Sequence, residues 1–303
     1  MQLDVTIKKI CSLEIQGAEN IAINAVTCFR DSMNSMKEDR DLVNKLIEIK
    51  NKLISSRPTE PCMRNSLDYL FYDLTGGSIK PQINKKADQI LNHFSSGQQI
   101  ISDIGAKKIK NGMVVFTHCH SSTVINILKK AKDLGKRFEV YNTETRPMWQ
   151  GRITAKELSS YGIPVTHFVD AAARVALKNS DIMLIGAESI TNEGKIINKI
   201  GSEMFAEVAK ALDVPVYACT DSWKFDVKTV FGFDIEIEKR HEKEVWKDKP
   251  KNVKINNFAF EIVRPEVITG VISELGIFNS LIFIEEIKRN YNWMFKTRNF
   301  YNF

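Results

Sequence analysis

Apolar residues recur at three- and four-residue intervals through the first third of the chain, which is the spacing of amphipathic helices. The periodic stretches are residues 10–29, 41–56, 85–94 and 100–109. One joint between them, residues 55–66, contains Pro58 and Pro61, which break the helical register. A second joint, residues 74–82, carries a Gly pair and a Pro. The pattern therefore predicts a helical N-terminal domain, a small bundle, over residues 1–108.

The rhythm changes at Met113, where short apolar, β-branched runs begin to alternate with helical stretches. The runs are residues 113–119, 138–144, 165–170, 182–187 and 214–220. They lack polar alternation, which is typical of a parallel sheet covered by helices on both faces. We therefore expect an α/β fold in which a doubly wound, Rossmann-like parallel-sheet domain occupies residues 109–303. Ligands of such sheets bind outside the carboxyl ends of the strands, so the loops after the strands are the places to search.

The number and distribution of charged residues indicate which class of ligand to expect. Lys and Arg outnumber Asp and Glu by 43 to 37, but the basic residues are scattered along the chain. A nucleic-acid surface normally needs a clustered basic face, so the balance favours a small phosphate-bearing ligand and no nucleic acid. Residues 235–257 are dense in charge and lie between two apolar runs. We expect this stretch to be a solvated excursion or flap.

The five cysteines contain no CxxC motif, and their odd number argues against a closed disulfide framework. The first residues carry charges where a signal peptide would need an apolar core, and no stretch has the roughly 18 apolar residues of a membrane span. We therefore expect a soluble, cytoplasmic protein that works in a reducing compartment without a membrane partner.

Cys119 ends the first predicted strand and is followed by an amphipathic helix. A thiol near a helix N-terminus has its pKa lowered, which predicts a thiolate that can accept a proton. The alternative is a small buried hydrophobic residue, which we expect for Cys28 and Cys219.

His118 and His120 flank Cys119 and suggest a metal site. Consecutive side chains on a strand point to opposite faces, however, so we expect no metal site here.

Residues 186–201 begin where a strand ends and lead into a helix, and they carry Glu188, Asn198 and Lys199. The three groups suit an anionic, hydroxylated substrate: the carboxyl exchanges protons, the amide bonds hydroxyls, and the ammonium neutralises phosphate. The alternative for Glu188 is simple solvation.

Further candidate phosphate contacts are Arg57, Lys224 and the Gly17–Ala18 turn, because phosphates accept from guanidinium, ammonium and free backbone amides. Each of them is also explained as an ordinary surface residue or helix break.

Five segments with this order and spacing resemble one known family. They are THCHSS (117–122), TETRPMWQGRITAKEL (143–158), GIPVTHFVDAAAR (162–174), GAESITNEGKIINKIG (186–201) and WKFD (223–226). The resemblance is to ribose-1,5-bisphosphate isomerases, methylthioribose-1-phosphate isomerases and the alpha, beta and delta subunits of initiation factor 2B. It extends to SLEIQGAENIA, SSRPTEP and residues 252–277. The forms at 118–121 and 146–151 look most like archaeal ribose-1,5-bisphosphate isomerases.

The resemblance implies interconversion of ribose 1,5-bisphosphate and ribulose 1,5-bisphosphate in pentose salvage, with a phosphorylated pentose as substrate. It implies Cys119 as proton acceptor and Glu188 in the place of the proton donor. It also implies a set of substrate-binding positions, namely Asn198, Lys199, Lys224, the phosphate-binding Gly17, Ala18 and Arg57, and Ser121 in the same pocket. It further implies a homo-oligomer, a dimer or hexamer, with neither a metal nor a redox cofactor.

This chain departs from the enzyme pattern at three places. Glu188 stands where the pattern has Asp, Gln16 and Glu19 flank the phosphate turn where it has Arg and Gly, and Ser202 replaces Thr. The Gly-Ala-Glu form resembles initiation factor alpha subunits. An alternative function is therefore a regulatory subunit that binds a sugar phosphate or nucleotide without catalysis and contacts translation initiation factor 2. A third interpretation is an isomerase of methylthioribose 1-phosphate.

Overall fold

The computed structural model describes residues 2–296, and its first third is helical, as predicted. The helices are α1 (Gln2–Cys11), α2 (Ala18–Asn34), α3 (Leu42–Ser56), α4 (Pro61–Tyr69) and α5 (Ile79–Ala106). The periodic stretch 10–29 is divided between α1 and α2, because the chain turns at Gly17 with a φ of 84°. Pro61 begins α4, where a missing N–H costs nothing because that group has no partner inside the helix.

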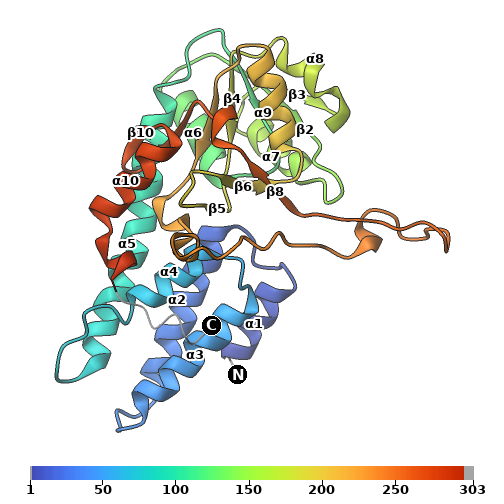
Figure 1. Cartoon of the computed structure of the whole chain (residues 1–303). Helices are drawn as coiled ribbons and strands as arrows, with labels where there is room; N and C mark the ends of the chain where they lie inside the picture. Colours follow the sequence, from blue (N-terminus) through green and yellow to red (C-terminus); the bar gives the residue numbers. More distant parts are fainter. Residues whose placement is uncertain (1, 297–303) are drawn as a thin grey trace.

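Beyond α5 the chain forms the predicted α/β fold around a mostly parallel sheet. The strands of this sheet are β1 (Val114–Thr117), β2 (Glu139–Thr143), β3 (Val165–Phe168), β4 (Ile182–Ile185), β7 (Val216–Cys219), β9 (Gly270–Ser273) and β10 (Gly276–Phe278). Their order is β10-β9-β7-β4-β1-β2-β3, and only the pairing of β10 with β9 is antiparallel. This is the Rossmann-like arrangement, with the helical part below it and α5 running up alongside the sheet (Figure 1).

Helices cover both faces of the sheet, so the strand residues alternate between two apolar cores. The helices are α6 (Ser122–Asp133), α7 (Gln150–Ser160), α8 (Ala173–Leu177), α9 (Ser202–Ala211) and α10 (Ser280–Asn290). Val115 and Leu184 pack with α5, α6 and α7 on one face. Phe116 and Met183 pack on the other face with α8, α9 and the N-terminal helices. The larger core thus contains both parts of the chain, and the division at residue 108 stays a prediction.

A small second sheet is inserted after β4. It consists of β5 (Ser189–Ile190), β6 (Ile196–Lys199) and β8 (Phe260–Val263), paired antiparallel. Residues 186–201 begin where β4 ends and lead into α9, as expected, but the hairpin between them, which places Asn198 and Lys199 on β6, was not predicted. A turn closes the hairpin between β5 and β6, with Gly194 at a φ of 75° and its N–H donating to the Thr191 carbonyl oxygen at 3.0 Å.

The charge-dense stretch 235–257 is irregular, as expected, apart from one short 3-10 turn at Glu242–Glu244. Figure 1 shows this segment, in orange, extending away from the body of the molecule. Among residues 2–296, no helix combines the length and the apolar content that crossing a bilayer requires.

Candidate active site

The direction of chain winding reverses between β1 and β4. From β1 the sheet continues outward through β2 and β3, and from β4 it continues the other way through β7 and β9. Strand ends at such a switch point leave a crevice. Here it is a cavity of about 590 Å³, which we call the switch-point cavity. Its volume lies in the range of small-molecule sites.

All nine residues singled out from the sequence line this cavity. They are Gly17, Ala18, Arg57, Cys119, Ser121, Glu188, Asn198, Lys199 and Lys224. They come from the N-terminus of α2, the end of α3, the loop after β1, the segment after β4, strand β6 and a 3-10 turn, η2 (Ser222–Lys224). Segments far apart in the sequence therefore meet at one place in the fold.

Cys119 is held in an unusual backbone conformation directly after β1. Its φ is 68°, in the left-handed region that costs a non-glycine residue roughly 1–2 kcal/mol. Two threonines hold it there: the Cys119 N–H donates to Thr145 Oγ1 at 3.0 Å, and Thr154 Oγ1 donates to the Cys119 carbonyl oxygen at 2.8 Å. Because these bonds fix the backbone, the position of the thiol at the cavity wall is fixed with it.

The predicted lowering of the Cys119 pKa is wrong. Burial raises the pKa of the Cys119 thiol above its usual value, and the positive charge of Lys199 opposes that rise. The short reach of a helix N-terminus does not outweigh the loss of water around the sulfur. Cys119 is therefore a neutral thiol at rest, and nearby positive charge is what favours its ionisation.

The histidines beside Cys119 do not form a metal site with it. His118 is buried, its Nδ1 lies 2.6 Å from Thr143 Oγ1, and its Nε2 lies 2.9 Å from the Ile200 carbonyl oxygen. Since a carbonyl oxygen only accepts, Nε2 carries the proton. Burial lowers the pKa of His118 to about 4, so the ring is neutral. His120 turns instead toward Thr154, at 3.1 Å.

Glu188 is positioned by the hairpin that follows it. Its N–H donates to the Ile197 carbonyl oxygen at 2.8 Å, which joins the segment after β4 to β6. Lys224 Nζ donates to the Ala187 carbonyl oxygen at 2.7 Å and holds the same segment from η2. Gly186 is needed here, because a Cβ at this position would lie 2.7 Å from Ser121 Oγ. The two strand-end loops therefore touch at the floor of the cavity.

Three of the cations that line the cavity differ in how they are paired. The Arg57 guanidinium lies 3.3 Å from a Glu238 carboxylate oxygen, so it is paired. Lys199 Nζ lies over the Phe260 ring at 4.5 Å from its centroid. Neither Lys199 nor Lys224 has a carboxylate at ion-pair distance within residues 2–296. The two lysines are therefore the cations best prepared for an incoming anion.

Part of the charged excursion forms a wall of the cavity, which the sequence pattern did not reveal. Glu238, Arg240 and Glu244 line it, and Arg240 Nη2 lies 2.7 Å from Glu244 Oε1. Arg146, in the loop after β2, donates from Nη2 to the Val245 carbonyl oxygen at 3.1 Å. The expectation of a purely solvated excursion is therefore incomplete. The mixture of Lys and Glu along this stretch does not indicate which charged side chains line the cavity.

Comparison with known proteins fits this geometry. The pattern of the Initiation factor 2 subunit family matches residues 14–280, which is most of the chain. The chain belongs to this family. A solved relative of 25% identity, a translation initiation factor eIF-2B from Pyrococcus horikoshii OT3, superposes with a TM-score of 0.81 over 91% of this chain and 96% of that one.

Two relatives of known sequence are more similar still. The ribose 1,5-bisphosphate isomerase of Pyrococcus furiosus is 37% identical, over 96% of this chain and 94% of that protein. The ribose 1,5-bisphosphate isomerase of Methanocaldococcus jannaschii is 38% identical, over 90% of each. Within the family, these names favour the isomerase interpretation over that of a regulatory subunit.

A carboxyl group lies next to the Gly17–Ala18 turn in this chain. Glu19, in the first turn of α2, lines the cavity, and burial together with the negative charge of Asp221 raises its pKa to about 6. Lys224 and His93 oppose this rise. Glu19 therefore links the cavity electrostatically to a cluster of ionisable groups behind it.

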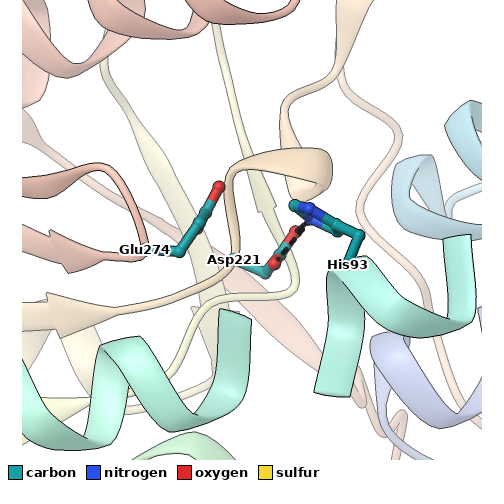
Figure 2. A group of neighbouring side chains, drawn as sticks. All are labelled: His93, Asp221 and Glu274. Atoms are coloured by element: carbon teal, nitrogen blue, oxygen red, sulfur yellow. Dashed lines mark hydrogen bonds and ion pairs between the residues drawn. The ribbon is translucent and has the colours of Figure 1, made fainter. Parts of the chain in front are cut away.

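That cluster consists of His93, Asp221 and Glu274, which Figure 2 shows converging from α5, the start of η2 and the segment after β9. Their ligand atoms all lie within 4.8 Å of one another. Each is already engaged, because His93 Nε2 lies 3.0 Å from Asp221 Oδ2 and Glu274 accepts from the Ser222 N–H at 3.1 Å and from the Tyr291 hydroxyl at 3.1 Å. We interpret it as a closed structural network that fixes η2, and hence Lys224. No motif in the sequence pointed to it.

Proposed function

We propose that this chain is an aldose-ketose isomerase that converts ribose 1,5-bisphosphate to ribulose 1,5-bisphosphate. The observation that carries the proposal is the convergence of Cys119, Glu188 and the basic residues on one cavity at the switch point of the sheet. The ribose 1,5-bisphosphate isomerases at 37% and 38% identity support the same substrate. The cavity offers a thiol, a carboxyl and cations, which are the groups that proton transfer on a sugar phosphate needs.

The reaction is an internal redistribution of protons. Glu188 donates a proton to the ring oxygen as its bond to C1 breaks, and Cys119, which has first lost its thiol proton to solvent, removes the proton from C2 as a thiolate. The resulting enol takes a proton at C1 from the Cys119 thiol, while the C2 hydroxyl returns its proton to Glu188 as the ketone forms. Protons balance over the cycle, and both residues return to their starting states.

The two phosphates are assigned to the two ends of the cavity. One binds at Arg57 and the N-terminus of α2, where Gly17 and Ala18 present free N–H groups and the helix dipole favours an anion. It displaces Glu238 from Arg57. The other binds near Lys199 and Lys224. Lys199 is also the residue whose positive charge favours the Cys119 thiolate.

The direct test is product formation by the purified full chain, followed by phosphorus NMR. Ribose 1,5-bisphosphate is expected to give ribulose 1,5-bisphosphate, and methylthioribose 1-phosphate, the substrate of the third interpretation, is expected to stay unchanged. Bound but unconverted ribose 1,5-bisphosphate would contradict the proposal. Conversion of methylthioribose 1-phosphate alone would replace it by the third interpretation.

The regulatory-subunit alternative predicts a different result. In that case immobilised protein would retain the alpha subunit of translation initiation factor 2, whereas an isomerase would not.

We further propose a homo-oligomer, a dimer or hexamer, in the cytoplasm, because the resemblance to the family's enzymes implies such an assembly. Light scattering on the eluted protein measures the assembly directly, and a monomeric mass would contradict it.

A further inference from the structure

Glu60 is a buried carboxyl without the partners that such a group normally has. It precedes α4, where its N–H donates to the Arg57 carbonyl oxygen at 3.2 Å and its carbonyl oxygen accepts from the Arg64 N–H at 3.2 Å. The residue is 2% exposed. Oε1 lies 3.6 Å from Arg57 Nε, but Oε2 has no hydrogen-bond partner among residues 2–296. A buried carboxylate oxygen left in this state costs free energy, so a proton or a partner is required.

Glu188 lines two cavities, and it shares one of them with Glu60. A second cavity of about 160 Å³, the small cavity, is lined by both Glu60 and Glu188. Glu188 also lines the switch-point cavity, whereas Glu60 does not. Glu188 therefore borders both the cavity proposed for the substrate and the small cavity that Glu60 lines.

The cations around Glu60 are largely committed to other groups. Arg64 in the small cavity donates to Asp226 Oδ1 at 2.6 Å and to the Pro58 carbonyl oxygen at 2.9 Å. Arg57 is shared with Glu238. The remaining charged groups that face Glu60 across the small cavity, or act on it from η2, are Glu188, Asp226, Lys228, Asp234, Glu236, Glu238 and Lys224. Negative groups outnumber positive ones in this set, so the surroundings favour a bound proton.

The electrostatics agree with this geometry. Burial first, and then the negative charge of Glu188, raise the pKa of Glu60 to about 8, while Arg57 and Lys224 oppose the rise. Two carboxylates that share one poorly solvated place do not both ionise at neutral pH, and their protons belong to the pair.

We propose that Glu60 and Glu188 form one carboxyl pair that holds a single proton at neutral pH, with Glu60 as the positioning residue that stores it. The proton stored on Glu60 passes to Glu188, which gives it to the substrate ring oxygen, so both carboxyls are ionised only during turnover, with Arg57 and Lys224 opposing their charge. The proton that leaves the C2 hydroxyl then restores the pair. The kinetic part of this inference rests on the proposed isomerase function, but the shared proton does not.

The shared proton is tested by carbon-13 NMR titration of full-length protein labelled at the glutamate carboxyl carbon. One resonance is expected to titrate near pH 8 and to be absent from Glu60→Gln. In Glu188→Gln the same midpoint is expected to fall, because the neighbouring negative charge is gone. Glu261→Gln is the control: it removes another carboxyl whose pKa burial raises, and it leaves the Glu60 midpoint in place. A Glu60 midpoint near the ordinary value of about 4.3, or one unmoved in Glu188→Gln, overturns the proposal.

Kinetics then test the positioning role. Glu60→Gln keeps the shape and a hydrogen-bond donor but cannot pass a proton, so kcat is expected to fall roughly 10- to 100-fold with KM nearly unchanged. An unchanged kcat with a raised KM would show that Glu60 acts in substrate binding, and it would overturn the proposed positioning role. If wild-type protein has no isomerase activity but titrates as described, the function fails while the carboxyl pair stands.

Discussion

Cys119 and Glu188 follow two neighbouring parallel strands, β1 and β4, and line the same cavity from opposite sides of the switch point. The close contact between Gly186 and Ser121 joins the loops that carry them. The proposed acid and base lie at strand ends and keep their spacing without help from a mobile loop, which suits the proposed proton transfer at two atoms of one sugar.

Lys199 is expected to control the ionisation of Cys119. Its charge opposes the rise in the thiol pKa that burial causes, so Lys199→Met should move that pKa further upward. The rate of thiol alkylation as a function of pH, corrected with Cys119→Ser protein for the exposed Cys11, measures this. Whenever the thiol pKa rises by one, the thiolate fraction near pH 7 falls about tenfold. Lys199→Arg is the matched control, and an unmoved midpoint in Lys199→Met would refute the coupling.

Glu19 is expected to weaken substrate binding as the pH rises. Its pKa of about 6 means that the carboxyl becomes negative above that pH, beside the proposed phosphate site. The ratio of the wild-type KM to the KM of Glu19→Gln should therefore increase between pH 6 and 8, to about fivefold, or ~1 kcal/mol. Taking the ratio cancels titration of the substrate phosphates. A ratio that stays constant across this range would contradict the assignment.

His118 is expected to make the protein sensitive to acid. Its folded pKa of about 4 lies below the ordinary 6.5, so the unfolded chain binds the extra proton and stability is lost as the pH falls through this window. The full effect is on the order of 3 kcal/mol. His118→Gln keeps an amide donor for the Ile200 carbonyl oxygen but does not titrate. Urea unfolding at pH 4 and 7 should show a smaller loss in the variant, and equal losses would refute the prediction.

Gly186 and Ser121 are expected to be coupled. In Gly186→Ala the new Cβ overlaps Ser121 Oγ, which should destabilise the protein by about 1–3 kcal/mol and raise KM. Ser121→Gly removes the obstructing side chain at little cost to the cap of α6, because glycine is tolerated there. A double-mutant cycle by thermal unfolding should therefore show recovery in the double variant. Strictly additive effects would mean that the two loops do not touch.

The strand-end part of the site was predictable from the sequence because parallel strands place their carboxyl ends at one edge. Short apolar runs located β1 and β4, and with them Cys119 and Glu188. The hairpin of β5 and β6 escaped detection, since its strands are too short to show a period and Ile196, Ile197 and Ile200 mimic a helix. The sheet order, which fixes the switch point, follows from long-range pairing that no local pattern encodes.

The rest of the site depends on contacts between distant segments. Gly17 and Arg57 reach the cavity because the helical part packs beneath the sheet, and only the family resemblance placed them there in advance. Glu60 carried no signal, since a lone Glu between two prolines is normally solvated. The pairing of His93 with Asp221, and the burial that raises the Cys119 pKa, likewise arise only from the folded packing.

The measurement that tests the account most directly compares turnover of ribose 1,5-bisphosphate by wild-type protein, Cys119→Ser and Glu188→Gln, with substrate affinity determined by calorimetry. We predict that both variants bind the substrate within a few-fold of wild type but lose about 10²- to 10⁴-fold in kcat. A correctly folded variant of either kind that turns over the substrate at the wild-type rate would contradict the assignment of Cys119 and Glu188 as the acid-base pair.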